Sequence, residues 1–215
     1  MLYRVIPQAL GPQLRDRLLE YAFNNEHRFD KSVLGTSEST DASVRHSLSL
    51  PDLGEHRAAI EKRVAAWIPG LLADLGVTPF QSTGFETELL AYGHGAFFQR
   101  HIDLYAGAAR SATGADRLLS IVYYFFREPR GFEGGVLRLH TGAGLPQGDG
   151  ERYVDISVEQ DMAVAFSSWL PHEVLGVRCP TGEFRDSRFS INCWALRARS
   201  QQTRATPAAL SERSA

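Results

Sequence analysis

The second half of this sequence, after Pro79, is built from eight short runs rich in β-branched and aromatic residues, with Gly, Pro and Asp clusters between them. Runs of this length and composition, bounded by turn-forming residues, are typical of an all-β sandwich or barrel. The runs span 85–92, 97–104, 118–126, 135–140, 153–158, 162–167, 172–177 and 188–196. No helical pattern alternates with them, so the sequence excludes a parallel α/β sheet. We therefore expect a two-sheet β core.

Two helices are predicted ahead of the β region. The first covers 12–25, where Pro12 can occupy the first turn and apolar residues recur every four positions. The second covers 55–75, with an apolar stripe along one side and a stop at Gly76. Because Pro69 lies inside it, we expect this helix to be kinked or divided there.

The length of 215 residues is typical of one domain with elaborations. Residues 29–49 are polar and without a sustained period, which predicts a loop with at most one short strand. We expect a single domain over 1–198, with helical support over about 1–78 and the β core over about 80–198. Residues 199–215 are expected to form a flexible tail.

Composition excludes several classes of protein. The chain has 23 Lys plus Arg and 25 Asp plus Glu, so it lacks the basic excess of a nucleic-acid binder. It has no apolar run long enough to span a bilayer, which predicts no membrane partner. Its two cysteines, Cys179 and Cys193, cannot form a disulfide framework, and we expect both to be buried and reduced, in the cytoplasm.

His101 and Asp103 form the first candidate site. Residues i and i+2 of a strand face the same way, about 6.5–7 Å apart, so this imidazole and this carboxylate can converge on one metal ion. Taken alone the pair is a weak signal, because seven His and 25 acidic residues produce such a pair readily by chance.

His172 opens a later strand and supplies the second imidazole. Two strands of a β sandwich can face each other across the core, which would bring His172 close to His101 and Asp103. Two imidazoles and one carboxylate with open coordination positions are the facial triad of non-haem Fe(II) oxygenases. A structural zinc site would require a fourth protein ligand.

A third candidate is the strand that begins at Arg188. Alternation places Arg188, Ser190, Asn192 and Trp194 on one face. This row faces either solvent or the interior of the β core. Polar groups in the interior are costly without a ligand, and a dicarboxylate is suited to the guanidinium fork and the Ser hydroxyl.

Together these residues resemble the 2-oxoglutarate/Fe(II)-dependent dioxygenases, and within them the prolyl 4-hydroxylase-like branch. The resemblance extends to a Tyr and a Gly-rich turn at 92–101, a Tyr-Tyr strand at 117–124 and a Gly-Gly-x-Leu-Arg strand at 134–138. It covers about 85–196, with the motifs in order. It implies a double-stranded β-helix of the jelly-roll or cupin-like type, with about eight strands and N-terminal helices in support.

The resemblance also implies a role for each matching residue. The ligands of Fe(II) would be His101, Asp103 and His172. The residues around 2-oxoglutarate would be Arg188, Tyr124, Ser190 and Tyr92. We expect substrate to meet Arg117 and Trp194 at the pocket mouth, His94 on the Gly-rich turn, and Tyr105, which opens a long polar segment at 105–116. A second long connection, 141–152, is expected to be a surface loop.

The implied cosubstrates are 2-oxoglutarate and O₂, with ascorbate in support. The leading hypothesis is a hydroxylase of a prolyl or other residue in a peptide or protein, acting as a monomer or homodimer. A hydroxylase of a free amino acid or small metabolite is the alternative on the same scaffold, and a non-catalytic metal-binding β-sandwich is the alternative of another class. A nucleobase demethylase is disfavoured, because such enzymes commonly carry a second Arg where this chain has Trp194. Glu86 and Glu88 share one strand face and are expected to be solvated.

Overall fold

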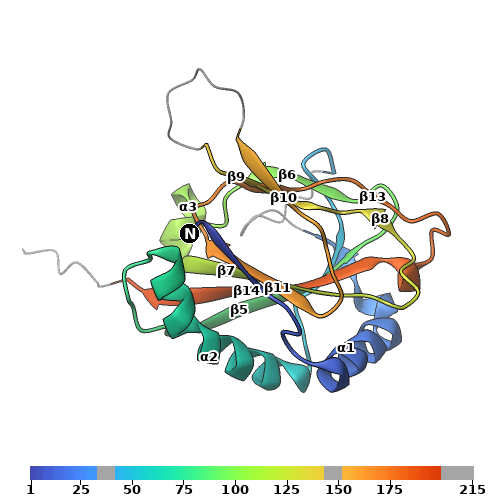
Figure 1. Cartoon of the computed structure of the whole chain (residues 1–215), viewed down its shortest axis with the longest axis horizontal. Coiled ribbons are helices and arrows are strands. Elements are labelled where there is room, and N and C mark those ends of the chain that lie inside the picture. The colour runs from blue at the N-terminus through green and yellow to red at the C-terminus, as the bar shows by residue number, and fades with distance from the viewer. Residues whose placement is uncertain (33–41, 143–151, 200–215) are drawn as a thin grey trace, which may run out of the picture.

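The structure, a computed structural model, describes residues 1–32, 42–142 and 152–199 (Figure 1). Its strands form a seven-stranded antiparallel sheet, a five-stranded antiparallel sheet and a two-stranded ribbon. In spatial order the large sheet consists of β1 (Tyr3–Ile6), β11 (Met162–Ser167), β7 (Ala115–Phe125), β14 (Arg188–Ala198), β5 (Gly84–Tyr92), β4 (Leu48–Leu50) and β2 (Asp30–Lys31). The small sheet consists of β10 (Tyr153–Ile156), β9 (Leu137–His140), β12 (His172–Val174), β6 (Phe97–His101) and β3 (Arg45–His46). The ribbon pairs β13 (Val177–Arg178) with β8 (Glu133–Gly134).

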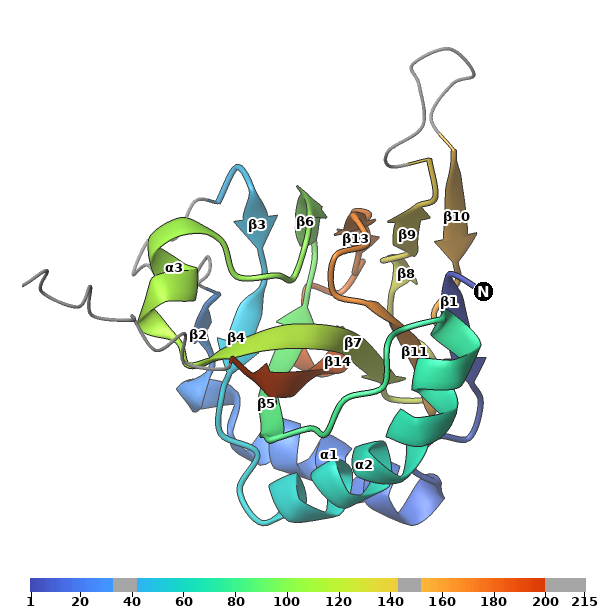
Figure 2. The same cartoon turned by 90° about the vertical axis from the view of Figure 1, so that its left-hand side faces the viewer.

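Helices α1 (Pro12–Asn24) and α2 (His56–Leu75) lie together on the outer face of the large sheet, as Figure 2 shows. Pro12 is the first residue of α1, where its missing N–H costs nothing. Helix α2 ends at Gly76, which adopts a left-handed conformation with φ 63°. It continues through Pro69 and is not divided there. Its apolar residues on both sides of the proline are buried in one core.

The large sheet separates two hydrophobic cores. Because side chains of a strand point alternately to opposite faces, Leu89 and Ala91 of β5 pack toward the helices, whereas Leu90 and Tyr92 pack between the two sheets. This arrangement confirms the expected mainly β fold with helical support, and all eight predicted runs contain strands. No helix in the described part of the chain is long and apolar enough to cross a membrane.

The N-terminal third is less purely helical than expected. Residues before 78 also provide β1, β2, β3 and β4, and β1 pairs along its whole length with β11. The segment 105–116 contains a short helix, α3 (Gly107–Ala112), where a loop was expected. Two short 3₁₀ turns occur at Glu26–Arg28 and Phe184–Asp186. Most of the 141–152 connection and the tail beyond residue 199 lie outside the described residues, and the single domain over 1–198 stays a prediction.

One buried carboxylate joins the start of α1 to the β core. Asp161, only 5% exposed, accepts hydrogen bonds from the backbone N–H groups of Leu10 and Gly11, each at 3.0 Å. It also accepts one from the Tyr123 hydroxyl at 3.0 Å. Burial and the adjacent carboxylate raise the pKa of Tyr123 above its ordinary value, so this hydroxyl stays a donor. Asp161 therefore satisfies three donors from two distant parts of the chain.

Replacing this carboxylate is expected to destabilise the protein more than removing any single donor. Asp161→Ala leaves three donors unpaired and should lower the free energy of unfolding by about 3 kcal/mol, against about 1 kcal/mol for Tyr123→Phe. Asp161→Asn, which tolerates the left-handed backbone here (φ 57°) and keeps one acceptor, should fall between them. Urea titration measures all three, and equal losses for Asp161→Ala and Tyr123→Phe would contradict this role.

Candidate metal centre

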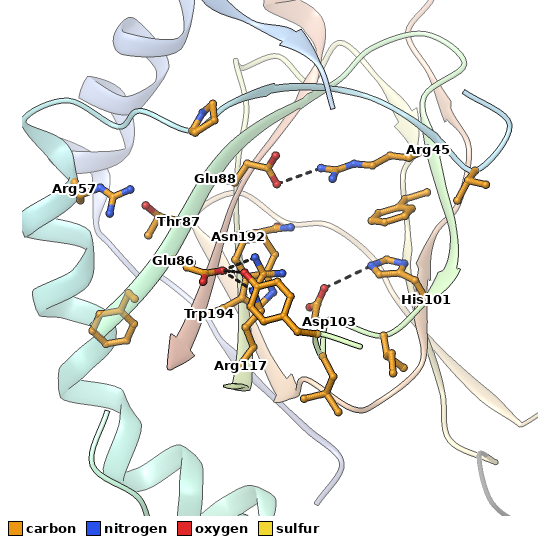
Figure 3. A pocket seen from close by; sticks show the side chains of 17 residues that line it. Arg45, Arg57, Glu86, Thr87, Glu88, His101, Asp103, Arg117, Asn192 and Trp194 are labelled. Atoms are coloured by element: carbon orange, nitrogen blue, oxygen red, sulfur yellow. Dashed lines mark hydrogen bonds and ion pairs between the residues drawn. The ribbon is translucent and has the colours of Figure 1, made fainter. Parts of the chain in front are cut away.

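His101, Asp103 and His172 converge at the open end of the space between the two sheets. The antiparallel register of β6 and β12 places His172 directly opposite His101. Asp103 Oδ1 lies 3.7 Å from His101 Nε2, and Asp103 Oδ2 lies 3.6 Å from His172 Nε2. The three potential ligand atoms all lie within 4.8 Å of one another. Figure 3 shows the side chains of His101 and Asp103 directed at each other and joined by a dashed line.

Strand alternation does not explain the position of Asp103, because this residue lies outside a strand. Strand β6 ends at His101, and Asp103 lies in a bend beyond it. Its backbone N–H donates to the Ser168 carbonyl at 2.9 Å, and its Oδ2 accepts from the Ser120 hydroxyl at 2.6 Å. The two Ser hydroxyls lie 2.9 Å apart. The position of the carboxylate is therefore set by β7 and by the turn that precedes β12.

Both imidazoles are oriented through their Nδ1 atoms. His101 Nδ1 lies 2.8 Å from the Gln99 carbonyl, and His172 Nδ1 lies 2.9 Å from the Leu170 carbonyl. Because a carbonyl only accepts, each Nδ1 carries the proton, which leaves the Nε2 lone pairs directed at the carboxylate. The His101 ring is also stacked on Phe98, with 3.5 Å between the ring centroids.

The protonation states of these groups suit a divalent cation. Burial and the neighbouring His172 lower the pKa of His101 to about 3, so its imidazole is neutral at physiological pH. Burial alone would raise the pKa of Asp103, but the nearby imidazoles and the Ser120 hydroxyl outweigh it and keep the carboxyl ionised. Metal ligands must be deprotonated in this way. Two nitrogen donors and one oxygen donor match a facial triad.

A buried guanidinium lies beside this centre. Arg188 is 1% exposed, and its Cζ lies 4.8 Å from the Tyr92 ring centroid and 4.7 Å from that of Tyr124. The sheet register produces this cluster, since it pairs Arg188 with Tyr92 and Ser190 with Tyr124. Among the described residues, no carboxylate pairs with Arg188. Its Nε and Nη1 atoms, the Tyr124 hydroxyl and the Ser190 hydroxyl are all buried without a hydrogen-bond partner.

These orphaned groups fit a carboxylate ligand. A buried charge without a counter-ion is strongly unfavourable, and a carboxylate would satisfy the guanidinium and both hydroxyls at once. Burial raises the pKa of Tyr124 to about 12, so its hydroxyl is a donor. Gly135 makes room for the arginine, because a Cβ there would lie 2.6 Å from Arg188 Cδ. A narrow inner cavity of about 20 Å³ is lined by His101, His172 and Arg188 together.

A second, larger cavity of about 510 Å³, which we call the outer cavity, is also lined by His101 and Asp103 (Figure 3). Arg117 forms part of its wall, with its Cζ 3.8 Å from the Trp194 ring and 4.5 Å from the Tyr105 ring. Glu86 accepts hydrogen bonds from Arg117 Nε at 2.7 Å and from the Tyr105 hydroxyl at 2.6 Å. Arg117, Trp194 and Tyr105, which were expected to meet substrate, therefore form one cluster of contacting side chains.

Other residues differ from the sequence expectation. Glu86 and Glu88, expected to be solvated, line the outer cavity in ion pairs, Glu88 with Arg45 at 3.3 Å. No local pattern pointed to these pairs, because their partners are distant in sequence. His94 is exposed, with its Nδ1 3.1 Å from the Cys179 carbonyl, and lines neither of these two cavities.

Both cysteines are buried and free, as expected.

Comparison with known proteins identifies relatives of this chain. The family model of the 2OG-Fe(II) oxygenase superfamily matches residues 87–196. An uncharacterised PKHD-type hydroxylase from Synechocystis sp. is 30% identical over 201 residues. That alignment covers 89% of this chain and 62% of the relative, so this chain spans less than two thirds of the relative's length.

Solved structures show the same fold. A prolyl-4-hydroxylase from Pseudomonas putida superposes with a TM-score of 0.62 at 23% identity, covering 91% of this chain and 92% of that one. A prolyl hydroxylase from Trichoplax adhaerens, in complex with a hypoxia inducible factor peptide fragment, superposes with a TM-score of 0.63 at 20% identity, covering 90% and 82%. The viral collagen prolyl hydroxylase of Paramecium Bursaria Chlorella virus-1 gives 0.59 at 16% identity, covering 93% and 97%.

The Ser120 hydroxyl is expected to strengthen metal binding at Asp103. Ser120→Ala should weaken the binding of Mn(II), used as a redox-stable probe, about 10- to 100-fold, because the carboxylate loses the bond that orients it. Ser120→Thr, which keeps the hydroxyl, should restore most of the affinity. Calorimetric titration under nitrogen measures the three dissociation constants. Equal affinities for wild type and Ser120→Ala would show that the hydroxyl does not position Asp103.

Proposed function

Because this chain belongs to the 2OG-Fe(II) oxygenase superfamily, we propose that it hydroxylates a C–H bond of a prolyl or other residue within a peptide or protein. In this proposal His101, Asp103 and His172 hold Fe(II). Arg188 and Tyr124 bind the distal carboxylate of 2-oxoglutarate. The observation that carries the proposal is the buried, unpaired guanidinium of Arg188 next to the triad.

The bound iron supplies the oxidative chemistry, in which O₂ and 2-oxoglutarate are consumed, a C–H bond becomes C–OH, and succinate and CO₂ are released. The protein supplies orientation and a dry environment. Arg188 offers a charged fork, and Tyr124 and Ser190 offer uncharged hydroxyls, to a carboxylate whose water shell they replace. A non-catalytic metal-binding sandwich would leave the cost of burying this arginine unexplained.

The wall of the outer cavity positions the substrate in this proposal. Arg117 contacts the Trp194 and Tyr105 rings and lines the same cavity as Asp103, so its side chain forms part of the surface that a substrate would meet. A cavity of about 510 Å³ lies within the usual size range of ligand sites, so it has room for a segment of a peptide as well as for a free amino acid.

The test of this function is an anaerobic titration followed by an activity assay. Wild-type protein with Fe(II) and 2-oxoglutarate should give a weak metal-to-ligand charge-transfer band in the visible, which His101→Ala and Asp103→Ala abolish. His27→Ala, which removes an exposed histidine outside the site, should leave the band intact. In air, mass spectrometry of peptide and free amino-acid pools should detect the gain of one oxygen atom in a peptide. No band, and no 2-oxoglutarate consumed with any pool, would refute the proposal.

Gly135 is expected to be needed for 2-oxoglutarate binding although it offers no side chain. In Gly135→Ala, the new Cβ would clash with Arg188 Cδ at 2.6 Å and with Val177 Cγ2 at 2.9 Å, which displaces the guanidinium. Losing one charge-assisted hydrogen bond raises the KM for 2-oxoglutarate roughly 10- to 100-fold.

Gly182→Ala is the matched control for backbone strain. Gly182 has φ +70°, close to the +66° of Gly135, but a Cβ there meets nothing within 4 Å. Both variants therefore place a Cβ at a similar positive φ, and only one of them crowds Arg188. Steady-state kinetics with varied 2-oxoglutarate compares them, and a similar KM in both would exclude the steric explanation.

A further inference from the structure

One edge of β5 is open beside the metal centre. Strand β14 pairs with β5 along its whole length, from Gly84 to Tyr92. On the opposite edge, β4 pairs with β5 only as far as Leu89, which lies opposite Leu50. Pro51 follows, which has no N–H to continue a ladder. Within the described ranges, no strand covers this edge of β5 from Gly84 to Glu88.

The outer cavity runs along this open edge. Phe85, Glu86, Thr87 and Glu88 all line it. A cavity against one face of a strand touches only alternate residues, so contact with four consecutive residues places the cavity at the edge. In Figure 3, Thr87 lies on the Arg57 side of β5, whereas Glu86 and Glu88 lie on the His101 side.

The main-chain groups of this edge have no ladder partner among the described residues. Four residues of a strand extend about 13 Å, and every second residue directs its N–H and C=O to the same side. Apart from the ladder with β14, no backbone hydrogen bond joins residues 85–88 to the described part of the chain. An unpaired edge of this kind is a template for another strand.

The edge leads directly to the metal centre. His101 and Asp103 line the same cavity as Phe85–Glu88, so a chain bound in this cavity along β5 has both potential metal ligands in the same space. The carboxylates on the way are already paired, Glu88 with Arg45 and Glu86 with Arg117. Recognition at this edge therefore falls to the main chain rather than to a charged side chain.

We propose that the open edge of β5 at residues 85–88 binds the main chain of the substrate, an extended polypeptide segment that adds to the large sheet as a strand. This inference rests on the proposed function and narrows it, because a free amino acid has no main chain to pair over this length. A reacting prolyl residue lies outside the paired positions, since proline has no N–H to donate.

A backbone methylation scan tests the pairing. A library of short random peptides, each with one fixed proline, is incubated with the Fe(II)-loaded protein, 2-oxoglutarate and O₂. The peptide that gains an oxygen atom fastest is then resynthesised as a series of variants, each with a single N-methyl amide at a different position. On one side of the reacting residue, methylation at every second position should raise the KM about five- to tenfold, because it removes one hydrogen bond. The intervening positions point away from β5 and serve as matched controls.

Hydrogen exchange supplies a readout independent of turnover. In the loaded protein without O₂, alternate amides of residues 85–88 should exchange rapidly, and the unmethylated peptide should slow them. The peptides methylated at the sensitive positions should leave the exchange of these amides rapid. Amides protected before any peptide is added would show that this chain or a second copy covers the edge, and would overturn the inference.

The remaining outcomes separate the inference from the function on which it rests. A peptide that is hydroxylated with no alternation in the scan overturns the edge and leaves the hydroxylase intact. Oxygen gained by free L-proline or another free amino acid, and by no peptide, overturns both the edge and the peptide substrate. If no pool consumes 2-oxoglutarate, the proposed function itself fails.

Discussion

The strongest physical constraint on this structure is a positive charge, that of Arg188, held in the protein interior without a counter-ion among the described residues. Arg188 lies between two tyrosine rings, 1% exposed, and the rest of the fold keeps it there. Burying an unpaired charge has a cost, which the two hydrophobic cores must offset. A site that maintains such a charge is suited to an anion, and the adjoining triad makes a chelating keto-acid the consistent partner.

The antiparallel register of the two sheets brings the residues of the candidate site together. In the large sheet, cross-strand pairing aligns Arg188 with Tyr92 and Ser190 with Tyr124. In the small sheet, it sets His172 opposite His101. The large sheet therefore contributes the buried guanidinium and the two hydroxyls near it, and the small sheet contributes the two imidazoles. The proposed function needs both sheets because neither one alone brings an imidazole near the guanidinium.

Much of this site could be predicted from the sequence because it depends on alternation along single strands. The period of two puts Arg188, Ser190, Asn192 and Trp194 on one face, and the structure shows that Arg188 and Ser190 on this face are buried. The eight strand-forming runs follow from composition and turn residues. Glu86 and Glu88 show where prediction from strand alternation stops. Alternation puts them on one face, but whether that face meets water or an arginine depends on β3 and β7, which come from elsewhere in the chain.

The sequence by itself determined the strand-forming runs after Pro79, which residues of each run share a face, and the chemical types of the candidate ligands, because these properties are local. Tertiary structure alone decided that β6 ends at His101, so that hydrogen bonds to Ser120 and Ser168 position Asp103 instead of the strand. It also decided that β4 stops short and leaves part of β5 uncovered. The physical reason is that the end of a strand and the partner of a charge are settled by packing between segments that are distant in the sequence.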